Sequence, residues 1–305
     1  MINRRQVLGL GAAIAAGHSL GLRASDIATR AATTRAIPSS GEAIPVIGMG
    51  TSRTFDTGND SETLAQLSAV MQAFYQGGGS VIDSSPMYGN AESRVGDVLR
   101  QLGRQPQTFA ATKVWTNGEQ AGVAQMEESA RRMNVERFDL IAVHNLKDWP
   151  THLKTLRAWK DEGKVRYIGI TTSHGREHEE LLDIMTREPL DFVQFSYNME
   201  DRAAEERLLP LAADRGIATM INRPYQRGAL FGKSRGQALP DVAADIGCIS
   251  WGQFFLKWIM GHPAATCVIP ATSKVGHMED NMQANKGALP DADQREEMSR
   301  AFAAL

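Results

Sequence analysis

In the stretch SVIDSS, residues 80–85, the short apolar run Val81–Ile82 is followed at once by the carboxylate of Asp83. Similar runs rich in Val, Ile and Phe recur along the chain, roughly 25–35 residues apart in most cases, which is the length of a strand–helix unit. With SVIDSS they make eight. The others are VIGMGT (46–51), FAATKV (109–114), LIAVHN (140–145), YIGITT (167–172), FVQFSY (192–197), ATMINR (218–223) and CVIPAT (267–272).

Helical periodicity fills the gaps between these runs. SETLAQLSAVMQAFYQGGG (61–79) places Leu64, Leu67 and Phe74 on one stripe and ends in glycines that stop a helix. The longest gap, before the last run, leaves room for an extra helix or loop ahead of WGQFFLKWIMG (251–261). Continuous apolar strands joined by helices predict a parallel sheet covered on both faces.

Eight strand–helix units predict closure of this sheet into a (β/α)8 TIM barrel. The alternative α/β fold is an open, doubly wound sheet, which predicts a G-x-G-x-x-G fingerprint after the first strand. GMGTSRTF (48–55) lacks that spacing, and the glycines at 77–79 precede a strand. We therefore predict one barrel domain over residues 44–305.

The bulk composition is that of a soluble globular protein. The chain has 305 residues, of which 42% are hydrophobic and 22% charged. A net charge of −2 argues against a general nucleic-acid binder. Cys248 and Cys267 lack a paired metal-ligand spacing, and two buried free thiols are favoured over a disulfide.

The N-terminus has the anatomy of a signal peptide. Arg4 and Arg5 precede a small-residue-rich apolar run, which resembles a twin-arginine export signal over residues 1–30. The run is about 16 residues long and contains His18, so a permanent membrane span is disfavoured; an apolar helix of the mature fold is the alternative. Residues 31–43 are expected to form a flexible linker, and the signal predicts a periplasmic location.

Polar side chains stand where several predicted strands end. In a TIM barrel the chemistry lies at the C-terminal ends of the strands. The second run supplies Asp83 and leads to Tyr88, the third supplies Lys113, the fourth supplies His144, and the sixth supplies Gln194. We expect these side chains to converge above one barrel mouth.

This combination suits the reduction of a carbonyl group. Free tyrosine has a pKa of about 10, and an ammonium nearby favours the phenolate and lowers that pKa. Lys113 can supply the ammonium, Asp83 can keep it charged, and His144 can orient a substrate oxygen by a second hydrogen bond. The hydride must come from a cofactor, because no side chain can donate one.

At these residues the sequence resembles the aldo-keto reductase family over about residues 44–285. The resemblance implies that Tyr88 is the general acid, that Asp83 and Lys113 support it, and that His144 positions the carbonyl during NAD(P)H-dependent reduction of an aldehyde or ketone. The matching stretches are GMGT (48–51), IDSSPMYGNAES (82–93), ATKVW (111–115), DLIAVHN (139–145), GKVRYIGIT (163–171), VQFSYN (193–198) and IPATSKVGHMEDN (269–281).

The resemblance also implies a nicotinamide cofactor, with NADP favoured and NAD the alternative. Thr171 and Thr172 replace the family's usual Ser-Asn, and Asn222 stands where an aromatic ring usually covers the nicotinamide. Ala271 and His277 replace the usual Lys and Arg at the 2′-phosphate. The full predicted cofactor set is Gly50, Thr51, Asp83, Thr171, Thr172, Gln194, Asn222, Arg223, Pro224, Arg227, Gly228, Thr272, Ser273, Lys274, His277, Asp280 and Asn281.

The resemblance places Met87, Trp115, Asn145 and Tyr225 in the substrate pocket. Little chain follows residue 281 to form a covering loop, so we expect an open mouth.

No metal is expected: HGREH (174–178) fits a zinc pattern, but a glycine lies between the histidines and a solvated helix start is favoured. The alternative function is a nicotinamide-binding sensor without turnover on the same barrel. Partners other than a small carbonyl substrate, and the oligomeric state, are not indicated.

Overall fold

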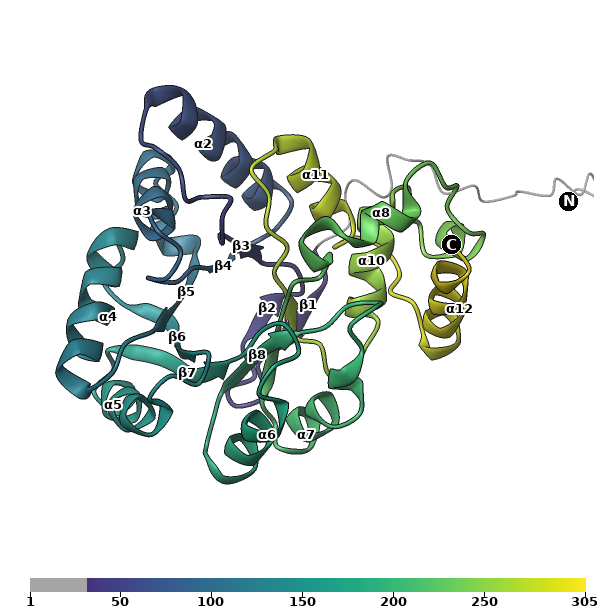
Figure 1. Cartoon of the computed structure of the whole chain (residues 1–305). Coiled ribbons are helices and arrows are strands. Elements are labelled where there is room, and N and C mark those ends of the chain that lie inside the picture. Colours follow the sequence, from purple (N-terminus) through teal and green to yellow (C-terminus); the bar gives the residue numbers. More distant parts are fainter. Residues whose placement is uncertain (1–31) are drawn as a thin grey trace, which may run out of the picture. The chain divides into compact units, whose positions relative to one another are not determined.

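We describe the fold from a computed structural model, in which residues 32–305 are described (Figure 1). The signal peptide expected over residues 1–30 lies outside the described residues. Eight parallel strands form one sheet in sequence order, and every apolar run quoted above contributes one of them. They are β3 (Met49–Gly50), β4 (Val81–Asp83), β5 (Phe109–Val114), β6 (Phe138–His144), β7 (Val165–Thr171), β8 (Phe192–Ser196), β9 (Ala218–Asn222) and β10 (Cys267–Val268).

The sheet closes between its first and last strands. Ile47 bridges Val268 in parallel, the Gly48 amide donates to the Val268 carbonyl at 2.9 Å, and the Gly50 amide donates to the Pro270 carbonyl at 3.0 Å. A Cβ on Gly50 would lie 2.9 Å from the Ile269 carbonyl oxygen, so only glycine allows this approach. The predicted (β/α)8 barrel is confirmed.

Helices follow the strands and cover the outside of the barrel (Figure 1). The long gap between β9 and β10 holds three helices, which accounts for its length. The α-helices are α2 (Ser61–Gln76), α3 (Ala91–Leu102), α4 (Glu119–Met133), α5 (Trp149–Asp161), α6 (His178–Arg187), α7 (Leu208–Asp214), α8 (Leu230–Ser234), α9 (Val242–Asp245), α10 (Trp251–Met260), α11 (Val275–Gln283) and α12 (Ala292–Ala303). Short 3-10 turns are η1 (Gln105–Gln107), η2 (Ala203–Glu205) and η3 (Gln226–Gly228).

A hairpin closes the N-terminal end of the barrel. Strands β1 (Thr34–Ala36) and β2 (Ala43–Pro45) pair antiparallel, and Ile37 and Ile44 are buried against residues at the starts of the barrel strands, such as Phe109. The prediction of a flexible linker over residues 31–43 is therefore wrong for this segment. The domain begins with the hairpin, which leaves the opposite end of the barrel open for a site.

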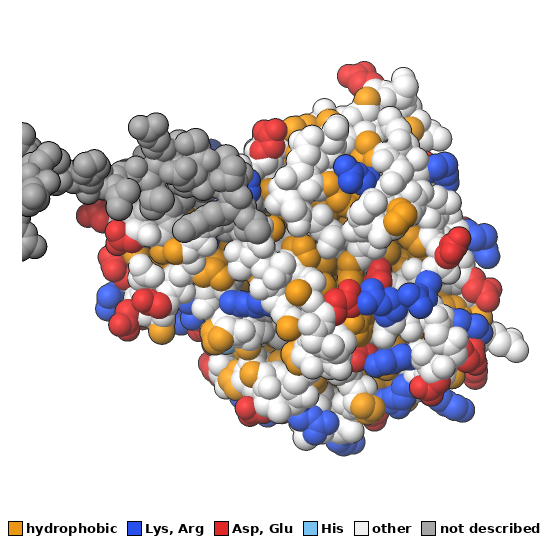
Figure 2. Space-filling model, turned by 180° about the vertical axis from the view of Figure 1, so that it is seen from behind, with side chains coloured by type: hydrophobic (Ala, Val, Ile, Leu, Met, Phe, Trp, Pro, Cys, Tyr) orange, Lys and Arg blue, Asp and Glu red, His pale blue; other side chains and the backbone are white. Residues whose placement is uncertain are grey.

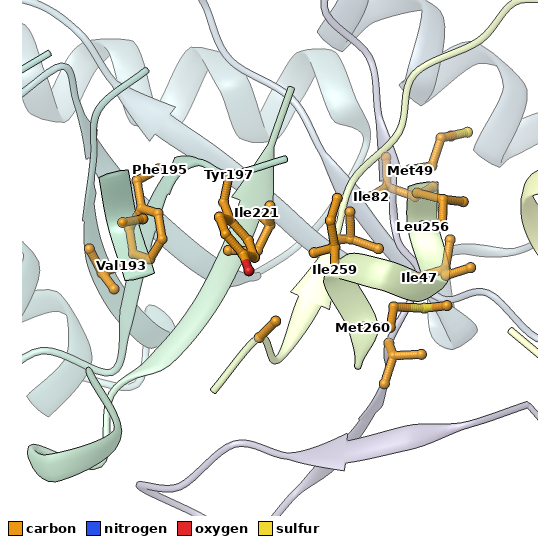
Figure 3. Packing of buried hydrophobic residues seen from close by; sticks show 14 of the residues in the cluster. Ile47, Met49, Ile82, Val193, Phe195, Tyr197, Ile221, Leu256, Ile259 and Met260 are labelled. Carbon is orange, nitrogen blue, oxygen red and sulfur yellow. The ribbon is translucent and has the colours of Figure 1, made fainter. Parts of the chain in front are cut away.

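The main apolar core lies between the strands and the surrounding helices. In Figure 3, Leu256, Ile259 and Met260 of α10 lie beside Ile47 and Met49, at the first strand of the barrel. These side chains are almost fully excluded from solvent, so they contribute the hydrophobic free energy that holds helix to sheet. The packing fixes the strand ends on which the site is built.

The thiols, the surface charges and the helices were also compared with the sequence. Cys248 and Cys267 are buried free thiols, as predicted. Acidic and basic side chains are interspersed over the face shown in Figure 2, with apolar side chains between them. Among residues 32–305, no helix combines the length and apolar character needed to cross a bilayer.

Candidate active site

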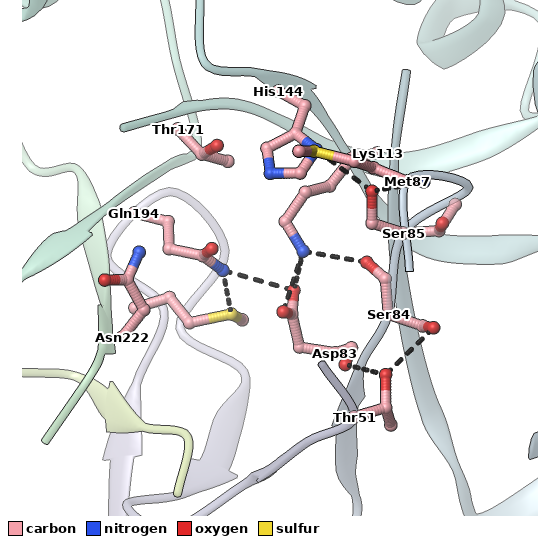
Figure 4. A network of polar contacts seen from close by, with 12 residues as sticks. Thr51, Asp83, Ser84, Ser85, Met87, Lys113, His144, Thr171, Gln194 and Asn222 are labelled. Carbon is pink, nitrogen blue, oxygen red and sulfur yellow. Dashed lines mark hydrogen bonds and ion pairs between the residues drawn. The ribbon is translucent and has the colours of Figure 1, made fainter. Parts of the chain in front are cut away.

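Polar side chains from four strands meet at the C-terminal end of the barrel (Figure 4). Asp83 is the last residue of β4, Lys113 lies near the end of β5, His144 is the last residue of β6, and Gln194 lies in β8. All four are at least 94% excluded from solvent. The structure thus brings together the strand-end residues that the sequence pointed to, as parallel neighbouring strands require.

Lys113 and Asp83 form a buried ion pair. The Lys113 ammonium donates to both Asp83 oxygens at 2.8 and 2.7 Å, and to the Ser84 carbonyl at 2.7 Å. Burial by itself lowers the pKa of Lys113, but the charge of Asp83 and the proximity of Tyr88 outweigh it and raise the pKa above its ordinary value. Lys113 is therefore charged at neutral pH.

Tyr88 lies beside this pair. The Lys113 ammonium is 5.2 Å from the centroid of the Tyr88 ring, and the Tyr88 and His144 rings meet edge to face with their centroids 5.7 Å apart. Burial raises the pKa of Tyr88, the Lys113 ammonium lowers it, and Asp83 raises it; the balance lies above the ordinary value of 10.0. The sequence analysis expected a lowered pKa. Desolvation outweighs the ammonium, and Tyr88 keeps its proton.

His144 is neutral. Burial, followed by the charge of Lys113, lowers the pKa of His144 from 6.5 to about 3. Its Nδ1 lies 3.0 Å from the hydroxyl of Ser85. At pH 7 the imidazole therefore carries a single ring hydrogen, with one nitrogen able to donate and the other able to accept.

Two amide side chains connect the strand ends around this centre. Gln194 donates from Nε2 to Asp83 Oδ1 at 3.1 Å, which adds a second donor to the carboxylate held by Lys113. Asn222 accepts from the Ser196 hydroxyl at 2.7 Å and donates to the Thr172 carbonyl at 2.9 Å. The Asn222 amide, which occupies the position of an expected aromatic ring, thus joins the ends of β7, β8 and β9.

A cavity of about 1000 Å³ opens above these residues. Of the predicted site, twenty residues line it: Gly50, Thr51, Asp83, Met87, Tyr88, His144, Asn145, Thr171, Thr172, Gln194, Asn222, Arg223, Pro224, Tyr225, Arg227, Gly228, Thr272, His277, Asp280 and Asn281. Lys113 lies beneath the cavity floor, fully buried behind Asp83. One volume large enough for an extended ligand therefore joins Tyr88 and His144 to the residues predicted for the cofactor.

Four predicted residues are placed differently from expectation. Trp115 does not line the cavity; its ring centroid is 6.5 Å from that of His144, and about a third of the residue is exposed. Ser273 and Lys274 do not line the cavity either; they lie just before α11. Tyr225, predicted for the substrate pocket, donates to Asn281 Oδ1 at 2.7 Å and so lies at the end of the cavity predicted for the adenine.

Sequence reasoning missed two basic residues that line the cavity. Arg53 follows the first barrel strand and Arg176 follows β7. The positive charge of each lowers the pKa of Arg223. Burial lowers the pKa of Arg223, and the neighbouring cations Arg227, Arg53 and Arg176 lower it further. Both residues could have been found by searching for polar side chains after the C-terminal end of every predicted strand, because each lies a few residues beyond a strand.

The cavity contains polar atoms without partners among the described residues. The Thr172 hydroxyl, the Asn145 side-chain oxygen and Nη1 of Arg223 are buried and form no hydrogen bond within residues 32–305. Unpaired buried polar atoms are costly, so such atoms mark where a ligand completes the hydrogen bonding. A hydroxyl, an amide and a guanidinium match the carboxamide and phosphate groups of a nicotinamide dinucleotide.

The HGREH segment does not have the geometry of a zinc site. His174 precedes α6 with a φ of 67°, whereas His178 is the first residue of that helix. The two histidines are therefore not one turn apart on a single helix. Over residues 32–305, no group of three or more His, Cys, Asp or Glu side chains is placed to hold a metal ion.

A (β/α)8 barrel with a buried Lys–Asp pair, a protonated tyrosine and a neutral histidine at its mouth is typical of an oxidoreductase built on this fold. The chain matches the Aldo/keto reductase family over residues 46–298 and belongs to it. The family resemblance noted from the motifs is thereby confirmed, together with the expected class of enzyme, an NAD(P)H-dependent carbonyl reductase.

The chain is similar to several individual proteins, two in sequence and one in fold. Methylglyoxal reductase YeaE of Escherichia coli is 27% identical over 246 residues, which cover 78% of this chain and 84% of that protein. Aldo-keto reductase YhdN of Bacillus subtilis is 30% identical over 209 residues, or 61% of this chain and 60% of that one. An aldo/keto reductase from Klebsiella pneumoniae, solved with NADP and acetate, superposes with a TM-score of 0.71 at 24% identity over 86% of this chain and 93% of its own.

Proposed function

We propose that this protein reduces a small aldehyde or ketone to the alcohol with NADPH, and that Tyr88 donates the proton. The observation that carries this proposal is the Lys113–Asp83 ion pair beneath the Tyr88 ring, with Lys113 Nζ 5.2 Å from the ring centroid. A binding protein needs neither a protonated tyrosine in the cavity nor a buried ammonium beside that tyrosine. A reductase needs both, because the oxygen of the carbonyl becomes an oxyanion and must be protonated.

The roles of the residues follow from their charges. The carbonyl oxygen lies between Tyr88 and neutral His144, which donates a hydrogen bond and orients it. As negative charge develops on that oxygen, the O–H bond of Tyr88 breaks, the proton moves to the substrate oxygen, and the bonding electrons remain on the phenolate. The Lys113 ammonium, held charged by Asp83, stabilises the phenolate.

The cavity residues fit a nicotinamide dinucleotide. When bound, the reduced cofactor supplies the hydride that forms the new C–H bond. Thr172 and Gln194 would hold the carboxamide, Arg223 and Arg227 the pyrophosphate, and Asn281 the adenine. We favour NADP because the cavity is rich in arginine and because the Klebsiella relative was solved with NADP. NAD is the alternative, since one Escherichia coli relative is named an NADH-specific methylglyoxal reductase.

Met87, which is about half exposed, lines the part of the cavity where we expect the substrate. Two relatives are named methylglyoxal reductases, so we propose compact carbonyl compounds such as 2-oxoaldehydes as the first substrates to test. The partner of this protein is then a small molecule.

The test combines binding with turnover. NADPH and NADH are titrated separately by fluorescence, and oxidation of each is followed with methylglyoxal and with unrelated aldehydes and ketones. The proposal requires tight binding of NADPH and carbonyl-dependent oxidation at a rate well above that without substrate. Tight binding with no turnover on any carbonyl would instead support the alternative function, a cofactor-binding sensor on the same barrel.

We also propose that the protein is exported to the periplasm by the twin-arginine route. Support comes from the sequence, in which Arg4 and Arg5 precede a short apolar run, and from the family match, which begins at residue 46. This route moves folded proteins, so the protein would fold, and could bind its cofactor, before export. Replacing both arginines by lysine should retain the protein in the cytoplasm; unchanged periplasmic recovery would contradict this proposal.

A further inference from the structure

Ser85 is a fully buried residue to which the proposed mechanism gives no role. It lies three residues before Tyr88, in the loop that follows β4. Its hydroxyl oxygen has two neighbours: the His144 Nδ1 atom at 3.0 Å and the backbone nitrogen of Met87 at 3.2 Å (Figure 4). The serine therefore connects the loop that carries Tyr88 to the histidine at the end of β6.

The hydrogen atoms in this contact can be assigned by elimination. The Met87 N–H can only donate, so the Ser85 oxygen accepts from it. The Ser85 hydroxyl hydrogen then needs an acceptor, and within residues 32–305 the remaining hydrogen-bond neighbour is His144 Nδ1. If Nδ1 carried the hydrogen instead, it would donate to Ser85 and leave the serine hydroxyl buried without an acceptor, which is costly.

The second ring nitrogen completes the assignment. A neutral imidazole carries one hydrogen, so a Nδ1 that accepts places that hydrogen on Nε2. The charged form, with hydrogens on both nitrogens, is disfavoured because burial and Lys113 lower the pKa of His144 to about 3. His144 lines the cavity, and its Nε2 has no hydrogen-bond partner among the described residues.

We propose that Ser85 is a positioning residue that holds His144 in the tautomer with its hydrogen on Nε2. The proposal rests on the proposed role of His144 as the hydrogen-bond donor to the carbonyl. In this tautomer the substrate oxygen faces two donors, the Tyr88 hydroxyl and the His144 Nε2–H. In the other tautomer a lone pair of Nε2 would face the oxygen as negative charge develops on it, and would oppose the reaction.

A double-mutant cycle tests the proposal. Ser85→Ala removes the hydroxyl, Ser85→Thr keeps it, and both are made alone and together with His144→Gln, whose side chain has no tautomers. We expect Ser85→Ala to lower kcat about tenfold, the worth of one hydrogen bond, with little change in Kd for NADPH. Ser85→Thr should restore most of this loss. In the His144→Gln background, Ser85→Ala should have no further effect on kcat.

The outcomes separate this proposal from the role of His144. If His144→Gln lowers kcat but Ser85→Ala does not, or if the two losses multiply, the role of Ser85 is refuted and that of His144 stands. If His144→Ala, which unlike His144→Gln removes every side-chain donor at this position, leaves kcat unchanged, the donor role itself is wrong. Nitrogen-15 NMR of labelled histidine provides a readout that does not depend on the variants folding: in the wild-type protein, a hydrogen on Nδ1 of His144 would overturn the proposal.

Discussion

Lys113 donates to both carboxylate oxygens of Asp83, at 2.8 and 2.7 Å, in a pair that is almost completely removed from solvent. Taking two charges out of water costs several kcal/mol each, and close pairing with additional hydrogen bonds offsets that cost. Gln194 supplies one such bond to Asp83, and the Ser84 carbonyl accepts another from Lys113. The pair is therefore satisfied as a unit, and removing one member leaves the other charge buried and unpaired.

Asp83→Asn should consequently damage both activity and stability. Without its counter-ion, the Lys113 ammonium is disfavoured by burial, its pKa falls, and support for the Tyr88 phenolate weakens. We expect kcat to fall about 100-fold and the free energy of unfolding in urea to fall by about 3 kcal/mol. Steady-state kinetics and urea denaturation measure the two effects.

Asp191→Asn is a matched control for this variant. Asp191 accepts from Lys160 at 2.8 and 2.6 Å and precedes β8, at the opposite end of the barrel. It should lower stability while kcat per folded molecule remains unchanged. Equal losses of kcat in the two variants would mean that Asp83 acts only through stability.

Tyr88→Phe should separate chemistry from binding. The change removes the proton donor and keeps the ring that packs against His144, so kcat for carbonyl reduction should fall about 10³-fold while Kd for NADPH stays nearly constant. Because the pKa of Tyr88 lies above 10.0, the wild-type rate should not decline as pH rises from 7 to 9. Loss of cofactor binding together with activity would instead indicate a structural role.

Arg223→Gln should weaken the binding of NADPH. Within residues 32–305, one buried nitrogen of the Arg223 guanidinium forms no hydrogen bond, and other cations flank it, so an anionic ligand relieves both conditions. We expect Kd for NADPH to rise about tenfold at low salt, and the dependence of Kd on salt to decrease. Arg187→Gln, which removes the same charge from the exposed end of α6, should leave Kd unchanged. An equal rise in Kd for both variants would contradict the assignment.

Strand ends explain why much of the site could be predicted. Asp83, Lys113 and His144 follow or end apolar runs, and parallel strands in a barrel bring such positions together whatever the loops do. Tyr225 was misplaced because η3 and its approach contain positive φ angles at Arg223, Gln226 and Arg227, which turn the chain in a way that residue patterns do not reveal. The raised pKa of Tyr88 depends on burial, which only packing determines.

The N-terminal hairpin shows a different limit. β1 and β2 are each only three residues long and lie in a segment rich in small and polar residues. Three residues are too few for an alternation of apolar and polar side chains to be recognised. What identifies the hairpin is the burial of Ile37 and Ile44 at the base of the barrel, a long-range contact. Composition alone favoured a linker there.

Two histidines should make the fold sensitive to acid. Burial lowers the pKa of His144 to about 3 and that of His262 to about 4. In the unfolded chain the histidine pKa values are near 6.5, so below that pH the unfolded state binds more protons than the folded state. The contribution of these two histidines to the free energy of unfolding is therefore complete above pH 6.5 and is lost as the pH falls toward their folded-state pKa values. At pH 5 the loss is ~2 kcal/mol for His144 and less for the partly exposed His262. Urea denaturation at pH 8, 6 and 5 measures it; a His144→Gln variant with the same pH dependence as the wild type would contradict it.

Lys257 is a second buried lysine, and its surroundings predict a purely structural role. Its ammonium donates to the carbonyls of Ile246, Lys286 and Ala288 at 2.6, 2.9 and 2.8 Å, and so ties the turn after α9 to the loop between α11 and α12. Lys257→Met keeps the length of the chain but leaves three carbonyls without this donor, and should lower the free energy of unfolding by ~2–4 kcal/mol. Because no carboxylate of the described part of the chain pairs with this ammonium, and Lys257 does not line the cavity, kcat per folded molecule should be unchanged. A fall in kcat at unchanged stability would show that Lys257 takes part in the reaction and that Lys113 is not the only lysine on which it depends.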